Sequence, residues 1–126
     1  MIIIGHELIP YSPLYKVSSK DEIQKTVPNS TIFMNFSHIK LAKYALSQDI
    51  NIALHVEGIK EACLANALGA KYITVEDNIA KSIQALATEY LFDSKILLLV
   101  EDESGIEVAA KSYIDGILLS KAIVVV

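Results

Sequence analysis

Short apolar runs alternate with amphipathic stretches along most of the chain. The runs typical of β-strands are 2–4, 31–36, 51–56, 71–76, 95–100 and 116–120, and the helical patterns are 20–25, 38–48, 59–68, 79–92 and 105–113. From residue 31 onward, strands start about twenty residues apart with no hairpin turn between them, which predicts right-handed crossovers and a parallel sheet. We therefore expect a single three-layer α/β domain over 1–126, with a mostly parallel sheet of five or six strands. Helices would cover both faces, in a Rossmann-like or flavodoxin-like architecture.

The helix expected over 79–92 has the clearest amphipathic pattern. Ile83 lies at the centre of its apolar face, and Gln84 falls on its polar face, so we expect Ile83 to be buried against the sheet. Helix 59–68 is apolar almost all round, which favours packing on two sides. Ser19 precedes helix 20–25, and Glu22 follows three residues later, the spacing of a capping box.

Two segments fall outside this rhythm. Residues 10–30 contain all three prolines and are expected to form a loop around the short helix. The tail 122–126 is apolar and uncharged, and an exposed edge of this kind invites pairing with another chain. Hydrophobic residues make up 52% of the chain, rich for a small domain, so we expect a homodimer. The alternative is that the tail completes the parent sheet.

Composition narrows the classes of partner. All eleven basic residues are lysine and the net charge is −4, so the bidentate donors that grip phosphates and guanine edges are missing. We therefore do not expect a nucleic-acid partner. No apolar run approaches the ~20 residues that span a bilayer, and the first strand lacks the basic flank of a signal peptide, so we expect a cytoplasmic protein without a membrane partner. Cys63 is the only cysteine, which excludes an internal disulfide.

Four of the expected strands run into acidic residues. The endings are Ile4-Gly5-His6-Glu7, His55-Val56-Glu57, Val75-Glu76-Asp77 and Val100-Glu101-Asp102. Because the carboxyl ends of parallel strands share one edge of an open sheet, and ligands bind along that edge, we expect these side chains to converge there.

Carboxylate oxygens are the ligands that Mg²⁺ prefers, so the edge is a candidate magnesium site. The candidate metal ligands are Glu57, Glu101 and Glu103. The candidate catalytic residues are Glu57, Glu101 and His55, since the two-residue spacing places His55 and Glu57 on one face of their strand. The competing interpretation is helix capping. Asp77 and Asp102 precede helices, where their side chains would accept hydrogen bonds from free backbone N–H groups.

Glycine-rich nucleotide-binding loops and the Gly-x-Ser-x-Gly motif are absent from the sequence. Two parts of the chain resemble known families. Residues 54–61 (Leu-His-Val-Glu-Gly-Ile-Lys-Glu), Gly69 and residues 99–105 (Leu-Val-Glu-Asp-Glu-Ser-Gly) resemble the Toprim pattern of primases, topoisomerases and related nucleases. That resemblance covers about residues 50–113. It implies Mg²⁺-dependent phosphodiester chemistry with Glu57, and with Glu101 and Glu103 as the later pair. Residues 61–73 and 114–118 are also similar to units of phosphate-binding (βα) barrels.

Three functions remain open from the sequence. The first is a non-enzymatic binding or assembly module, whose ligand site would lie at the carboxyl ends of the strands. The second is a Mg²⁺-dependent phosphotransfer enzyme or phosphodiester hydrolase that uses the strand-end carboxylates. The third is a sensor of a small phosphorylated ligand, which would bind at the same edge without turnover.

Overall fold

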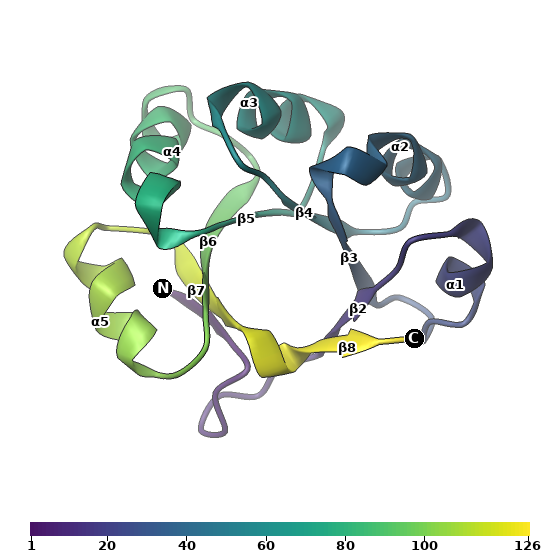
Figure 1. Ribbon diagram of the computed structural model, residues 1–126, viewed down its shortest axis with the longest axis horizontal. Helices are drawn as coiled ribbons and strands as arrows, with labels where there is room; N and C mark the ends of the chain where they lie inside the picture. Colours follow the sequence, from purple (N-terminus) through teal and green to yellow (C-terminus); the bar gives the residue numbers. More distant parts are fainter.

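One sheet of eight parallel strands forms the centre of the computed structural model, which describes residues 1–126 (Figure 1). The strands are β1 (Ile2–Ile4), β2 (Leu14–Lys16), β3 (Thr31–Asn35), β4 (Ile52–His55), β5 (Tyr72–Val75), β6 (Lys95–Val100), β7 (Gly116–Leu119) and β8 (Ile123–Val125). The helices are α1 (Lys20–Gln24), α2 (Ile39–Ser47), α3 (Ile59–Leu68), α4 (Asp77–Glu89) and α5 (Ser104–Lys111), with 3-10 turns η1 (Phe36–His38) and η2 (Ser120–Ala122). The parallel α/β class predicted from the sequence is confirmed.

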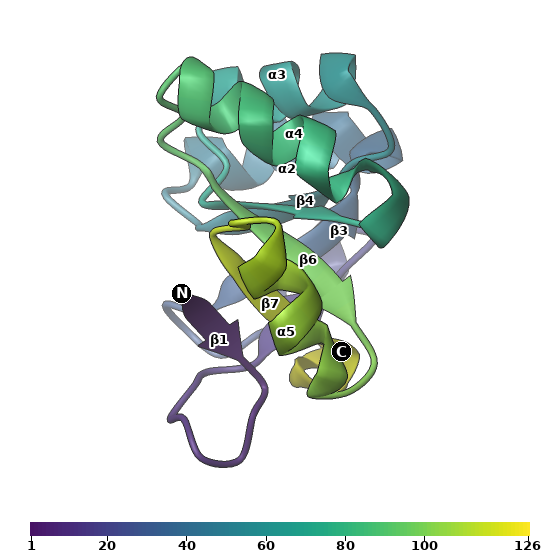
Figure 2. The same ribbon diagram turned by 90° about the vertical axis from the view of Figure 1, so that its left-hand side faces the viewer.

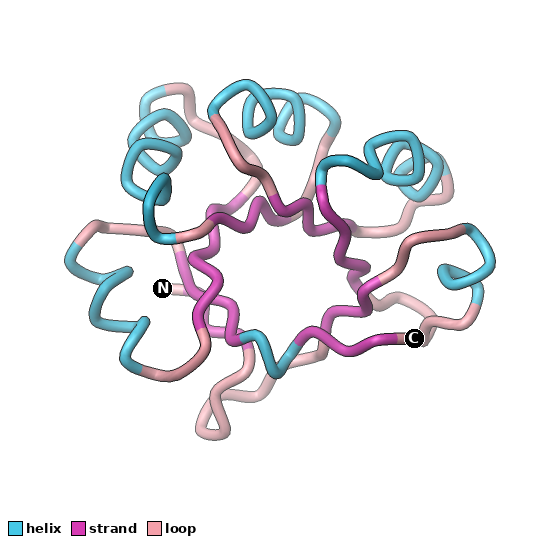
Figure 3. Tube along the Cα trace, in the orientation of Figure 1, coloured by secondary structure: helices cyan, strands magenta, loops and turns pink.

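The sheet has more strands than expected, and its helices all lie on one face. Its order is β1-β7-β6-β5-β4-β3-β2-β8, so the chain advances in one direction from β2 to β7. Right-handed crossovers that advance in one direction place every helix on the same face. The expectation of five or six strands with helices on both faces was therefore wrong. Figure 3 shows the strands curling around a centre with the helices outside, and Figure 2 shows the same arrangement from the side.

The curled sheet, which we call the half-barrel, buries its uncovered face against itself. Its inner face carries a cluster of seven buried residues, namely Ile4, Leu14, Phe33, Ala53, Leu97, Leu118 and Ala122. The larger cluster, of 23 buried residues, lies between the outer face and the helices. Gly116 permits a close approach on the inner side, because a Cβ there would lie 2.3 Å from the carbonyl oxygen of Ile2. The half-barrel thus needs no second layer of helices.

Strands β2 and β8 were missed by the sequence interpretation. β2 lies within the segment expected to be a loop, and it pairs with both β3 and β8. Each of the two strands has only three residues, too few to show an alternating pattern. The apolar tail therefore completes the parent sheet, as the alternative interpretation proposed, and β8 forms one of its two edges.

Gly5 lies where the end of β1 meets the connection between β7 and β8. Its φ of +112° is in the region that favours glycine, and a Cβ at this position would lie 2.7 Å from the Cβ of Leu119. η2 carries the chain past this point from β7 to β8. The glycine thus allows β1 to pair with β7 while β8 continues to β2.

The helices match their predicted positions closely but differ in which side chains they bury. Ile83 is fully buried, as predicted, whereas Gln84 is also buried, contrary to its expected place on the polar face. α3 buries Ala62 and Ala65 but leaves Leu64 45% exposed, so the expected packing on two sides was wrong. None of the helices combines the length and the apolarity that crossing a membrane requires.

The predicted cap of α1 is present with a changed partner. The hydroxyl of Ser19 accepts a hydrogen bond from the backbone N–H of Glu22 at 3.2 Å. The carboxylate of Glu22 accepts from the backbone N–H of Ser18 at 2.8 Å, and not from the N–H of Ser19 as in a standard capping box.

Candidate functional site

Five of the eight strands, and the residues that directly follow two others, contribute side chains to one open pocket at the carboxyl end of the half-barrel. The pocket has a volume of about 410 Å³. It is lined by Lys16 of β2, Phe33 and Asn35 of β3, His55 of β4, Glu76 after β5, Leu99 of β6, Ser120 after β7, and Ile123 and Val125 of β8. We call this pocket the mouth. Because all strands are parallel, their carboxyl ends meet at this edge as predicted.

Strand alternation explains the composition of the mouth. Side chains two residues apart point to the same face of a strand, so five of the seven inner residues are followed, two positions later, by a residue of the mouth. Ala53 of the inner cluster is followed in this way by His55, and Leu14 is followed by Lys16. The apolar inner cluster therefore forms the floor, and the last inward position of each strand forms the wall.

His55 is the most constrained polar residue of the mouth. Its Nδ1 lies 2.8 Å from the hydroxyl of Thr74, which is fully buried on the neighbouring strand. Its Nε2 lies 3.7 Å from a carboxylate oxygen of Glu76, and its ring centroid lies 6.3 Å from that of Phe33. The imidazole is thus held in place on one side and presents its other nitrogen beside a carboxylate.

The mouth has a polar side and an apolar side. The polar side chains come from the consecutive neighbours β2, β3, β4 and β5, namely Lys16, Asn35, His55 and Glu76. On the apolar side, β6 contributes Leu99, and β8 contributes Ile123 and Val125. Ser120, which follows β7, lies between these two strands along the chain. Lys16 takes part in none of the three ion pairs of the structure, and Glu76 pairs only with His55. The positive and negative groups of the mouth therefore do not neutralise each other.

The three candidate metal ligands lie in two different hollows. Glu57 lines a hollow of about 150 Å³ together with His55 and Glu61. Glu101 and Glu103 line another hollow, of about 290 Å³. No group of three or more histidine, cysteine or acidic side chains is arranged to hold a metal ion. The structure thus brings His55 and Glu57 together, but it separates Glu57 from Glu101 and Glu103, and the magnesium site stays a prediction without a preformed set of ligands.

Asp102 binds a backbone N–H group at the start of α5, as the capping interpretation predicted, whereas Asp77 makes no side-chain hydrogen bond. Asp102 accepts from the N–H of Ser104 at 2.9 Å, and hydrogen bonds from the hydroxyl and the N–H of Ser104 lower the pKa of Asp102. Glu61 accepts from the N–H of Glu57 at 2.9 Å. Glu76 is the N-cap residue of α4, and its side chain makes no capping bond. Its carboxylate is therefore available to the mouth.

The other histidines lie away from the mouth. His6 accepts the N–H of Leu8 at its Nδ1 and contacts Glu103 through Nε2, at 3.1 Å and 2.8 Å respectively. This arrangement fixes the segment after β1 beside the start of α5. His38 is exposed at the end of η1 and does not line the mouth.

The sequence interpretation missed Lys16, Asn35, Ser120 and the supporting Thr74. Lys16 lies on a strand that was not recognised. Asn35 and Thr74 could have been found through the pairing of the strands. Each is the Cα partner of His55 on a neighbouring strand. Strand register alone would have aligned these three residues on one face.

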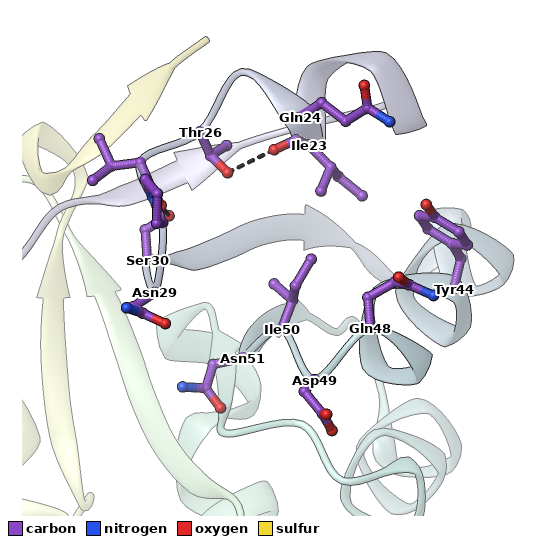
Figure 4. Close-up of a pocket in the computed structure, with 12 residues that line it drawn as sticks. Ile23, Gln24, Thr26, Asn29, Ser30, Tyr44, Gln48, Asp49, Ile50 and Asn51 are labelled. Carbon is purple, nitrogen blue, oxygen red and sulfur yellow. Dashed lines mark hydrogen bonds between the residues drawn. The ribbon is translucent and has the colours of Figure 1, made fainter.

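The largest hollow of the protein lies elsewhere, between α1 and α2 (Figure 4). Its volume is about 480 Å³, and residues 26–30 and 48–51 before β3 and β4 form much of its lining. The hydroxyls of Thr26 and Ser30 donate to carbonyl groups within their own turn, at 2.7 Å and 2.6 Å. Asn29 and Asp49 have φ values of 66° and 58°, which polar turn residues tolerate. These residues are explained by turn formation, and we therefore favour the mouth despite its smaller volume.

Comparison with known proteins leaves the function to be argued from the geometry. The chain matches none of the protein families with which it was compared, and no curated protein sequence matches it either.

Proposed function

We propose that the protein is a binding module that takes a small molecule into the mouth of the half-barrel. The observation that carries this proposal is the convergence on one open pocket of side chains from five strands and from the residues that follow β5 and β7. A pocket of about 410 Å³ with an apolar floor and a few convergent polar groups has the size and composition of small-ligand sites. Its polar groups stand on short strands of a packed sheet, so a ligand would meet an arrangement that is largely preformed.

The charge of the surrounding edge argues against a phosphorylated ligand. The segments after β1, β4, β5 and β6 carry acidic residues, namely Glu7, Glu57, Glu61, Glu76, Asp77, Glu101, Asp102 and Glu103. Only one lysine lines the mouth, and the chain has no arginine. These carboxylates would repel a phosphate unless a cation intervened. Both the Toprim-like hydrolase and the phosphorylated-ligand sensor are therefore less well supported than binding of a ligand without phosphate.

Binding without turnover is favoured because the mouth lacks a nucleophile paired with His55. The one hydroxyl residue that lines the mouth, Ser120, donates to Glu101 at 2.9 Å, while the Nδ1 of His55 is paired with Thr74. Nucleophilic catalysis uses a nucleophile within hydrogen-bond reach of its base. His55 and Glu76 are better placed to orient a ligand.

The proposal is tested by nuclear magnetic resonance with a panel of amino acids, carboxylic acids, amines, monosaccharides and sugar phosphates. We expect at least one compound to shift the backbone amide signals of Asn35, His55 and Ser120 saturably. Leu99→Lys, which places a long charged chain in the mouth, should abolish those shifts. The control Gln48→Ala, in the hollow between α1 and α2, should leave them unchanged. Shifts confined to that hollow, or the absence of any saturable shift, would contradict the proposal.

We also propose that two copies associate through exposed apolar surface. The exposed residues Ile59 and Leu64 of α3 support this proposal. Light scattering at micromolar concentration should give the mass of a dimer for the native chain. The double substitution Ile59→Lys and Leu64→Lys should then give a monomer, whereas a monomeric native chain would overturn the proposal.

A further inference from the structure

We infer that the ligand of the mouth is a zwitterion with an aliphatic group, of the class of branched-chain α-amino acids. This inference rests on the proposed function, because it names the class of molecule that the same pocket would take. Three features of the pocket carry it: the separation of its two charges, the polar groups between them, and the apolar side.

The two charged groups of the mouth stand on separated strands. Lys16 ends β2 and Glu76 follows β5, while β3 and β4 lie between these strands in the sheet. Lys16 has no ion-pair partner, and the side chain of Glu76 is 60% exposed beside His55. A ligand with one charge would match only one of these two groups. A ligand with a carboxylate and an ammonium group matches both.

The groups between the two charges suit the same ligand. Asn35 and His55 end the strands that separate Lys16 from Glu76. An asparagine amide can donate to a carboxylate and accept from an ammonium group. Because the Nδ1 of His55 is engaged by Thr74, its Nε2 is the nitrogen available beside Glu76. The acidic residues around the mouth also favour a ligand that carries a positive group.

The apolar side of the mouth accounts for the rest of the ligand. Leu99 and Ile123 are half-buried members of the surface packed on the inner cluster, and Val125 is 80% exposed. An aliphatic side chain placed against them would remove apolar surface from water on both sides. Each methylene buried in this way should strengthen binding roughly fourfold, which distinguishes leucine from glycine.

Isothermal titration with four probes tests the inference. L-leucine has both charges and the side chain, 4-methylpentanoate lacks the ammonium group, 3-methylbutylamine lacks the carboxylate, and glycine lacks the side chain. We expect L-leucine to bind at least about tenfold more tightly than each of the other three, since every omission leaves part of the mouth unmatched.

Two substitutions assign the charges to their partners. Lys16→Met should weaken binding of L-leucine and 4-methylpentanoate but not of 3-methylbutylamine. Glu76→Gln should weaken binding of L-leucine and 3-methylbutylamine but not of 4-methylpentanoate. Lys81→Met and Glu89→Gln make the same charge changes at exposed positions of α4, away from the mouth, and should leave all affinities unchanged.

The possible results separate this inference from the function on which it rests. Saturable binding of an uncharged or phosphorylated panel compound at Asn35 and His55, without binding of L-leucine, would overturn the ligand class and leave the binding function standing. Equal affinities for L-leucine, 4-methylpentanoate and 3-methylbutylamine would also overturn the ligand class. If no panel compound shifts the signals of the mouth, both proposals fail.

Discussion

Thr74 fixes the imidazole of His55 across the pair of strands that carries them. The two residues are Cα partners in the parallel register of β4 and β5, and the Oγ1 of Thr74 lies 2.8 Å from the Nδ1 of His55. Thr74 is fully buried, and the imidazole of His55 is the only side-chain hydrogen-bond partner of its hydroxyl. A buried hydroxyl without a hydrogen-bond partner costs free energy. The pairing therefore stabilises the register of β4 and β5, and it also fixes the orientation of the histidine ring.

Substitution of Thr74 by valine tests this orientation. Valine has the same shape but lacks the hydroxyl, so we expect the His55 ring to become mobile and its Nδ1 to lose its partner. The free energy of unfolding should fall by only about 1 kcal/mol. Nitrogen-15 signals of the His55 imidazole would report the change. Thr31→Val, near the start of β3, is the control and should not alter those signals. Unchanged imidazole signals in Thr74→Val would show that the ring is held by other contacts.

Ile83 is expected to contribute strongly to stability because it is fully buried between α4 and the sheet. Truncation to alanine should lower the free energy of unfolding by ~2–5 kcal/mol, through lost burial and the cavity left behind. Val108→Ala is the control, since Val108 of α5 is 42% exposed, and it should cost less than about 1 kcal/mol. Denaturant unfolding measures both values. Similar losses for the two variants would mean that the buried face of α4 is misassigned.

Gln84 links α4 to the starts of β6 and β7 through Asp115. Its side-chain oxygen accepts from the N–H of Asp115 at 2.8 Å, and its Nε2 donates to the Asp115 carboxylate at 3.2 Å. The same carboxylate accepts from the N–H of Ile96 at 2.9 Å. Gln84→Ala should therefore cost about 1–3 kcal/mol, because the partly buried N–H and carboxylate of Asp115 lose a partner.

The exposed Gln24 provides the control for that experiment. Gln24→Ala should change the free energy of unfolding by less than about 0.5 kcal/mol in the same denaturant titration. Loss of slow hydrogen exchange at the amide of Asp115 in Gln84→Ala would locate the effect. An exchange rate equal to that of the native chain would argue against the bond.

Glu22 is expected to make the stability depend on pH in the acidic range. Hydrogen bonds from the hydroxyl and the backbone N–H of Ser18 lower the pKa of Glu22 below its ordinary value of 4.5. Since the folded-state pKa is depressed, the stabilisation is fully present above pH 4.5 and is lost as the pH falls through the lower folded value. Ser18→Ala should reduce this loss, as measured by urea unfolding over a series of acidic pH values. Glu89→Gln is the control and should keep the native pH dependence.

Much of the fold could be predicted from the sequence because it depends on local patterns. The apolar runs and amphipathic stretches located six strands and five helices, and the absence of hairpin turns indicated parallel pairing. β2 and β8 escaped because three residues carry no detectable alternation, and only pairing with each other and with β3 makes them strands. The burial of Gln84 escaped because its partner Asp115 lies 31 residues away in the chain.

The candidate site was predicted in its location and only partly in its residues. The edge at the carboxyl ends and the residue His55 followed from parallel strands and from strand alternation. The predicted grouping of Glu57 with Glu101 and Glu103 is absent from the structure. Their spacing along the chain does not tell how far apart β4 and β6 lie in the sheet. In the structure β5 lies between them, and the carboxylates line separate hollows.

The sequence by itself determined the class of the protein: a parallel α/β domain with its polar strand ends along one edge. Hydrophobic periodicity and chain reversals depend on residues that are close together in the sequence. Each helix or strand could therefore be recognised without its neighbours in space. Only the tertiary structure decided that the sheet curls, because this depends on the five crossovers from β2 to β7 advancing in one direction and leaving one face without helices. That curl brings Lys16 of β2, Glu76 after β5 and Val125 of β8 around one mouth, a proximity that no spacing along the chain contains.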